Sequence, residues 1–154
     1  MFFGMNLGLG LARVEQPGLS DDPSLGLEYD AIFGLALTRR WAASLELSTW
    51  QPPNLDGNPS HFHMFAWRVE YTLGPADGLV LSTSLGLGLG DGSQSKRIGS
   101  ASALSLGYRW PLADEVTLAI EAGAHGAAFT DGNALIPFTA LHLRFYGRSK
   151  VRFD

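Results

Sequence analysis

Three polar residues in the second half of the chain, Ser105, Glu121 and His125, have the types found in nucleophilic catalysis. In a hydrolytic triad the histidine takes the proton of the serine hydroxyl while the carboxylate orients the imidazole ring. Residues an even number of positions apart share one face of a strand, so Glu121 and His125 point the same way. Ser105 lies on the corresponding face of the preceding predicted strand. The same three residues also fit a buried polar network, and we favour that interpretation.

A histidine pair suggests a second kind of chemistry. His61 and His63 flank Phe62 at the start of a predicted strand, so both imidazoles can share one face and bind a metal ion. No third ligand stands out, because Asp56 falls in a loop. We therefore predict neither a metal site nor a cofactor, and interpret the pair as polar residues near the end of a strand.

The composition indicates one domain with an unusual surface. The 154 residues include 19 glycines and no cysteine, only 17% are charged, and the net charge is −4. Soluble domains have about a quarter charged residues, so this chain has too few charges to coat an ordinary water-facing surface. The small, unclustered charge gives no basic patch for nucleic acid, and the lack of cysteine excludes disulfides and thiolate metal sites. No apolar run is long enough for a transmembrane helix.

Alternation with a period of two predicts strands along most of the chain. In Met5–Arg13 and Leu81–Leu89, methionine or leucine alternates with small residues. A glycine at every second position would cost a helix about 1 kcal/mol each. The N-terminal segment lacks the basic region of a signal peptide, so it is also interpreted as a strand, with any signal removed before Met1. The eight predicted strands are Met5–Arg13, Leu25–Leu37, Trp41–Trp50, His61–Leu73, Leu81–Leu89, Ile98–Trp110, Val116–Phe129 and Leu135–Tyr146.

The connections between these strands fall into two alternating classes. Long, turn-rich connections and one shorter link alternate with tight links. An even number of antiparallel strands, with longer loops at one end and short turns and both termini at the other, is typical of an outer-membrane barrel. The sequence therefore predicts an all-β protein, an eight-stranded antiparallel up-and-down transmembrane β-barrel. The longer loops are 15–24, 51–60, 90–97 and 130–133, and the tight links are 38–41, 74–78 and 111–115.

Side-chain volume predicts which strand face points outward. An eight-stranded barrel has an interior just wide enough for side chains to fill it. The face rich in leucine and aromatic residues is too bulky for that lumen, whereas the opposite face is mostly Gly, Ala, Ser and Thr. We therefore expect leucine to face lipid. The inward face is then predicted to carry an ion network of Glu28, Asp30, Glu46, Arg68, Glu70, Arg109, Glu121, His125, His142 and Arg144.

The inward charges are expected to pair, because an isolated ion in a dry lumen is costly. If a tight turn around Asp131-Gly132 sets the register of the last hairpin, Glu121 lies across from His142 and Arg144. Glu46 is expected within diagonal reach of Arg68. The network is predicted to close the lumen, so a neutral residue in place of Arg68 or Arg144 is expected to raise the conductance.

Aromatic residues gather near both ends of the predicted strands. Such girdles mark the membrane interfaces of barrel proteins. The short-turn end is predicted to carry Phe2, Phe3, Trp41, Tyr71, Tyr108, Trp110, Phe145 and Tyr146, and the other end Trp50, Phe62 and Phe129.

These patterns resemble the small outer-membrane barrels of the OmpA membrane-domain, OmpX and opacity-protein type. The last strand, TALHLRFYG at 139–147, is similar to the terminal assembly signal of such proteins, with Ala140 where glycine is often found. The resemblance implies a bacterial outer-membrane barrel over residues 1–148 and a short periplasmic tail at 149–154. Both termini would be periplasmic and the long loops extracellular. Membrane lipid, lipopolysaccharide and other envelope proteins are the partners it implies.

Three functions are compatible with the sequence. The first is a non-enzymatic barrel with a structural, surface-loop or complex-docking role. The second is an enzyme that acts on outer-leaflet lipid and resembles the lipid A deacylases. Its candidate catalytic residues on the lipid-facing side would be His63, Ser100 and Ser102. The histidine-x-serine pairing of those enzymes is absent at His125. The third is a soluble, lipocalin-like carrier of an apolar ligand.

Overall fold

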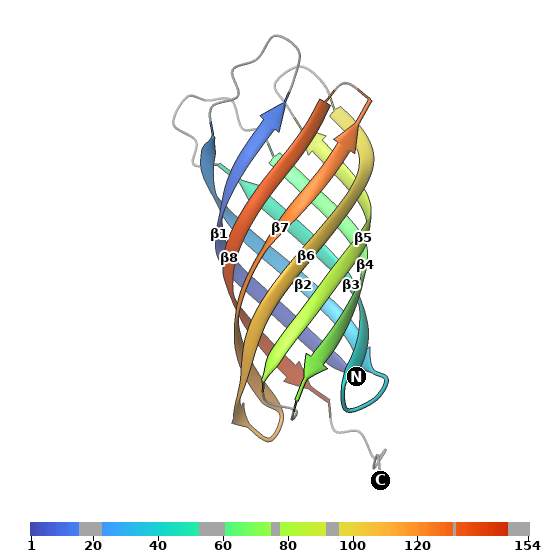
Figure 1. Cartoon of the computed structure of the whole chain (residues 1–154), viewed down its shortest axis with the longest axis vertical. Coiled ribbons are helices and arrows are strands. Elements are labelled where there is room, and N and C mark those ends of the chain that lie inside the picture. The colour runs from blue at the N-terminus through green and yellow to red at the C-terminus, as the bar shows by residue number, and fades with distance from the viewer. Residues whose placement is uncertain (16–22, 53–60, 75–77, 92–95, 131, 148–154) are drawn as a thin grey trace.

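The computed structural model describes residues 1–15, 23–52, 61–74, 78–91, 96–130 and 132–147. Eight antiparallel strands form a closed barrel in which each strand pairs with its neighbours in sequence and the last strand pairs with the first (Figure 1). The predicted fold is thus confirmed. No helix in the described residues is long and apolar enough to cross a membrane. The strands are β1 (Phe2–Glu15), β2 (Ser24–Ala36), β3 (Trp41–Gln51), β4 (His61–Leu73), β5 (Leu79–Asp91), β6 (Lys96–Ala113), β7 (Val116–Phe129) and β8 (Gly132–Tyr146).

Strands β1, β5, β6 and β8 extend two or three residues beyond their predicted bounds, and β6 is irregular at its end. This strand continues past Trp110 to Ala113, and its register against β7 shifts between Pro111 and Ala113. A proline lacks the backbone N–H that a ladder needs, so it is tolerated where the pairing is irregular. The predicted tail at 149–154 lies outside the described residues.

The connections β2–β3, β4–β5 and β6–β7 lie at the end where β1 begins and β8 ends, which we call the short-turn end. The opposite end is the long-loop end. The β2–β3 turn is held by its own hydrogen bonds: the Thr38 hydroxyl accepts from the backbone N–H groups of Arg40 and Trp41, at 3.1 and 3.0 Å. After β4, Gly74 has φ of 100°, a conformation that favours glycine.

The two faces of the sheet differ as predicted. Leu85, Trp67 and Phe33 are 69%, 66% and 61% exposed on the outside. The exposed charged side chains within the described strands are Arg13 and Lys96, both near the long-loop end. A Cβ built on inward-facing Gly26 would lie 2.6 Å from Cε2 of the Trp50 indole, so glycine there makes room for a large lumen side chain.

Buried apolar side chains fill the lumen in its long-loop half, and we call them the apolar cluster. The Trp50 indole N–H donates to the Gly10 carbonyl at 3.0 Å, and Phe129 packs on the cluster. The prediction of an outer aromatic belt from Trp50, Phe62 and Phe129 is therefore wrong: these rings share the inward parity of the lumen residues on their strands. The cluster consists of Ala12, Trp50, Phe62, Met64, Ala66, Ala101, Ala103, Ala127, Ala134 and Ile136.

Candidate functional site

Glu70 on β4 is the hub of a buried ion network in the short-turn half of the lumen. Its carboxylate accepts two hydrogen bonds from Arg144 on β8, at 2.6 and 2.7 Å. It also accepts from Arg109 at 3.0 Å and from Arg68 at 2.9 Å. All four side chains are at most a tenth exposed. Three guanidinium groups thus converge on one carboxylate, and those of Arg109 on β6 and Arg144 on β8 reach it from other strands.

Arg68 extends the network to two further carboxylates. Its guanidinium donates to Glu46 at 3.1 Å, and one nitrogen donates to both oxygens of Glu121, at 2.6 and 2.8 Å. Ser84 also donates to Glu46, and Ser105 to Glu121. The predicted reach between Glu46 and Arg68 is therefore present. We call Glu46, Glu70, Glu121 and the three arginines the arginine network.

The register of the last hairpin differs from the prediction. Phe129 pairs with Gly132, so Glu121 lies opposite Ala140 and not opposite His142 or Arg144. His142 is a diagonal neighbour whose Nδ1 lies 3.6 Å from Glu121, while Arg144 reaches across the lumen to Glu70. A turn at Asp131-Gly132 would pair Thr130 with Asn133, whereas the observed first pair, Phe129 with Gly132, lies one residue earlier in the chain, and this shift moves each facing pair by two positions.

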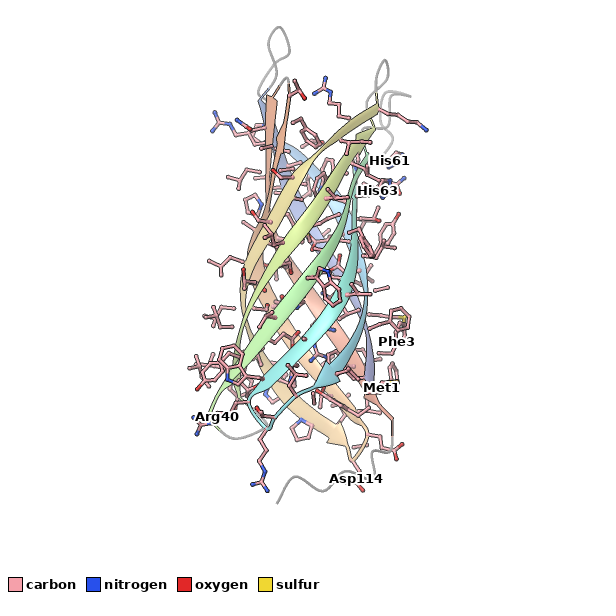
Figure 2. All side chains as sticks on the ribbon, turned by 90° about the vertical axis from the view of Figure 1, so that its right-hand side faces the viewer. Met1, Phe3, Arg40, His61, His63 and Asp114 are labelled. Atoms are coloured by element: carbon pink, nitrogen blue, oxygen red, sulfur yellow. The ribbon has the colours of Figure 1, made fainter. Side chains whose placement is uncertain are left out.

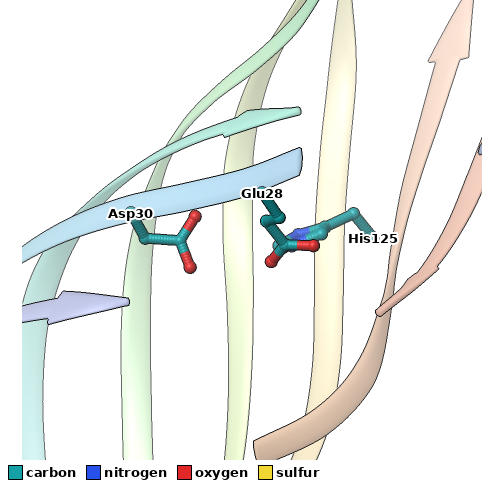
Figure 3. Close-up of side chains that lie close together, drawn as sticks. All are labelled: Glu28, Asp30 and His125. Carbon is teal, nitrogen blue, oxygen red and sulfur yellow. The ribbon is translucent and has the colours of Figure 1, made fainter. Parts of the chain in front are cut away.

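The remaining ionisable lumen residues form a separate group. His125 on β7 has its Nε2 2.9 Å from an oxygen of Glu28 on β2 (Figure 3). Asp30 accepts a hydrogen bond from the Asn6 amide at 2.8 Å. His125 also stacks on Phe138, with ring centroids 4.6 Å apart. Both acids are buried, and within the part of the chain that the structure describes their hydrogen bonds and ion pairs go to Asn6 and His125, not to the lumen arginines.

The structure does not assemble the serine hydrolase arrangement. Ser105 bonds to Glu121 and to Ser82, whereas His125 uses Nε2 to meet Glu28 and its Nδ1 has no partner in the described structure. The histidine is therefore not oriented to take a proton from this serine. All of these atoms are also buried in the lumen, away from the outer surface where a lipid substrate would lie.

The lipid-face candidates are also separated. His63 contacts the Thr49 hydroxyl through Nδ1, at 3.0 Å, and its ring stacks with His61 near the long-loop end (Figure 2). It pairs with Leu89 on β5, while Ser100 and Ser102 lie on β6. Strand β5 lies between β4 and β6. Because neighbouring strands are about 4.8 Å apart, the backbone at His63 is two strand spacings away from that of either serine. These residues do not converge on one point.

Six residues of the predicted aromatic girdle lie on the outer face near the short-turn end. Ring pairs join Phe3 to Phe33, Trp41 to Tyr71 and Tyr108 to Trp110, at centroid distances of 4.8, 4.6 and 5.0 Å. The six are Phe3, Trp41, Tyr71, Tyr108, Trp110 and Phe145.

Tyr146 and Phe2 are placed differently from the prediction. Phe2 is only 4% exposed and lies under the Arg144 guanidinium, with its ring centre 4.2 Å from the guanidinium carbon. The ring centroids of Tyr146 and Phe2 are 5.8 Å apart. Both line a cavity of about 560 Å³ at the short-turn end, which reaches Arg144 and Arg109. Their even positions share the parity of Arg144 and Gly4, so alternation alone assigns them to the lumen.

No protein-family model and no curated protein sequence matches the chain. Solved structures do match. Neisserial surface protein A has a TM-score of 0.76 at 11% identity, over 94% of this chain and 97% of that one. Ail of Yersinia pestis has a TM-score of 0.61 at 13% identity, over 94% of this chain and 98% of that one. The N-terminal barrel of Pseudomonas aeruginosa OprF has a TM-score of 0.51 at 15% identity, over 93% of this chain and 97% of that one. The fold is that of the small eight-stranded outer-membrane β-barrels.

Proposed function

We propose that the chain is an integral protein of the bacterial outer membrane, without enzymatic activity, whose closed barrel has a structural role or docks other envelope components. The main support for this proposal is the contrast between the two faces of the sheet. Large apolar side chains are exposed around the outside, while the charged side chains of the strands are mostly buried inside. In water this arrangement would expose an apolar belt, whereas in a bilayer it places leucine against hydrocarbon.

Two layers of side chains in series support a closed lumen. The arginine network lies in the short-turn half, and the apolar cluster lies in the long-loop half. Ions crossing the barrel would have to pass both a dense set of ion pairs and a packed apolar layer. The wild-type barrel is therefore expected to carry no current steps in a planar bilayer.

Conductance tests the closed lumen directly. Arg68→Ala removes the link between three carboxylates, and Trp50→Ala opens the apolar cluster, so the double variant is expected to conduct. Arg13→Ala, on the outer face, is the matched control and should remain closed. Regular current steps from the wild-type protein would overturn the closed-lumen proposal and indicate a channel.

The orientation is proposed from the fold, and because the chain has no cysteine, single-cysteine variants can test it. With both strand termini at the short-turn end, we place that end in the periplasm and the long loops outside the cell. A Lys96→Cys variant at the long-loop end should react with a membrane-impermeant maleimide on intact cells. Asp114→Cys, in the β6–β7 turn, should react only after the outer membrane is broken. The opposite labelling pattern would reverse the orientation.

A further inference from the structure

A group of three buried side chains in the lumen has the composition of a metal site. Glu28 and Asp30 on β2 and His125 on β7 each offer one ligand atom, and these atoms lie within 4.8 Å of one another (Figure 3). The three residues are 0%, 6% and 2% exposed. Because β2 and β7 are not neighbours in the barrel, the group joins two walls across the lumen.

Unpartnered polar atoms point to a missing ligand. Glu28 uses one oxygen toward His125, and Asp30 uses one oxygen to accept from Asn6. The second oxygen of each carboxylate is buried and has no hydrogen-bond partner in the described structure. A buried carboxylate oxygen without a partner is costly, and a bound cation would remove that cost.

The charge count supports a divalent cation. Five described lumen carboxylates, Glu28, Asp30, Glu46, Glu70 and Glu121, accompany three lumen arginines. The arginines are all engaged in the arginine network, through the last three of these carboxylates. The two excess negative charges are therefore those of Glu28 and Asp30, beside His125, which would bind a metal in its neutral form. One divalent cation would balance them.

The donor set favours a transition metal. One imidazole nitrogen and two carboxylate oxygens, with a fourth position for water, match zinc coordination, whereas calcium requires six to eight oxygens. We propose that Glu28, Asp30 and His125 bind one Zn²⁺ ion inside the barrel, and that the ion cross-links β2 to β7. Asn6 is a positioning residue, since its amide holds the Asp30 carboxylate toward the site.

Zinc binding to the refolded protein tests this proposal. The chain is folded in detergent with Zn²⁺ either present during folding or added afterwards, because the site is enclosed. Bound zinc is then counted by elemental analysis after gel filtration. The wild type should retain one zinc per chain, and Asp30→Asn and His125→Gln should retain none. Asn6→Ala should weaken binding by about 10- to 100-fold, the usual effect of losing a residue that orients a ligand.

Two matched variants locate the ion. His142→Gln changes the other lumen histidine, which lies by Glu121, and the double variant His61→Asn with His63→Asn removes the surface pair. Both should keep the zinc. A heat-dependent shift on an SDS gel verifies that each variant is folded. If one site variant does not fold, the visible spectrum of wild-type protein loaded with Co²⁺ still reports whether the metal has one nitrogen and several oxygen ligands.

Three results would overturn the proposal: no zinc in the wild type under either loading condition, zinc retained by folded Asp30→Asn, or zinc lost with the surface histidines. The first result would mean that protons neutralise Glu28 and Asp30. None of these outcomes bears on whether the barrel spans a membrane or is closed.

Discussion

Replacing Glu70 by glutamine removes the charge on which the arginine network converges. The change keeps the shape of the side chain but leaves Arg109 and Arg144 without the carboxylate that each contacts. The glutamine side chain also has an NH₂ group, which would face the N–H groups of the guanidiniums, so that donor faces donor. Urea unfolding of the protein in lipid vesicles, followed by tryptophan fluorescence, measures the loss of stability.

The size of the loss follows from the contacts. Glu70 accepts four hydrogen bonds from charged donors. A hydrogen bond to a charged group contributes about 1.5–3 kcal/mol. The sum over the four bonds is an upper limit for the loss of unfolding free energy, because the contributions of neighbouring contacts are not additive. Removing one partner of a single buried ion pair costs about 3–5 kcal/mol, and we expect a loss in this range. At about 1.4 kcal/mol per factor of ten, the folded-to-unfolded ratio falls by roughly 100- to 4000-fold.

Asp114→Asn is the matched control for this experiment. Asp114 is exposed in the β6–β7 turn, so its neutralisation should change the stability by less than about 0.5 kcal/mol. A Glu70→Gln loss as small as that of the control would refute the reasoning. The arginines would then be satisfied by water or other partners, and the network would not hold the walls of the barrel together.

Two further substitutions test the faces of the sheet by the same unfolding assay. Leu85→Arg places a charge on the outer surface and should cost about 2–4 kcal/mol in vesicles, against about 0–1 for Leu112→Arg near the short-turn end; equal costs would argue against a lipid-facing belt. Gly26→Ala should cost about 1–3 kcal/mol because the added Cβ would lie 2.6 Å from both the Gln51 carbonyl oxygen and the Trp50 indole. In Gly126→Ala the added Cβ would have no neighbour closer than 3.7 Å, so this variant should be nearly neutral; a Gly26→Ala loss as small as that of Gly126→Ala would show that the surroundings of Gly26 are loosely packed.

Much of the fold could be predicted because lipid on one side and a narrow lumen on the other impose a strict period of two. The same period of two also assigns the aromatic rings near the strand ends to one face or the other. Trp50 shares its parity with Glu46, and Phe62 shares its parity with Arg68, so both rings could have been assigned to the lumen. Their position near strand ends suggested an interfacial belt instead.

The cross-lumen contacts could not be predicted from strand patterns. Glu28 meets His125 over a separation of 97 residues, and Glu70 meets Arg144 over 74. Such pairs depend on the tilt and stagger of the closed barrel, which alternation within a strand does not encode. The register error in the last hairpin has a related cause, since one turn residue decides which side chains face each other.

Tryptophan quenching by lipid tests the central claim most directly, namely which face of the sheet meets the membrane. Two chains are compared in vesicles of lipid brominated at mid-chain: one keeps only Trp67 and the other keeps only Trp50, with phenylalanine at the other tryptophan positions. Trp67 is 66% exposed on the outside of β4, and Trp50 is 4% exposed in the lumen. We predict strong quenching of Trp67 and little of Trp50. Weak quenching of Trp67, with the protein soluble in the absence of lipid, would contradict the account.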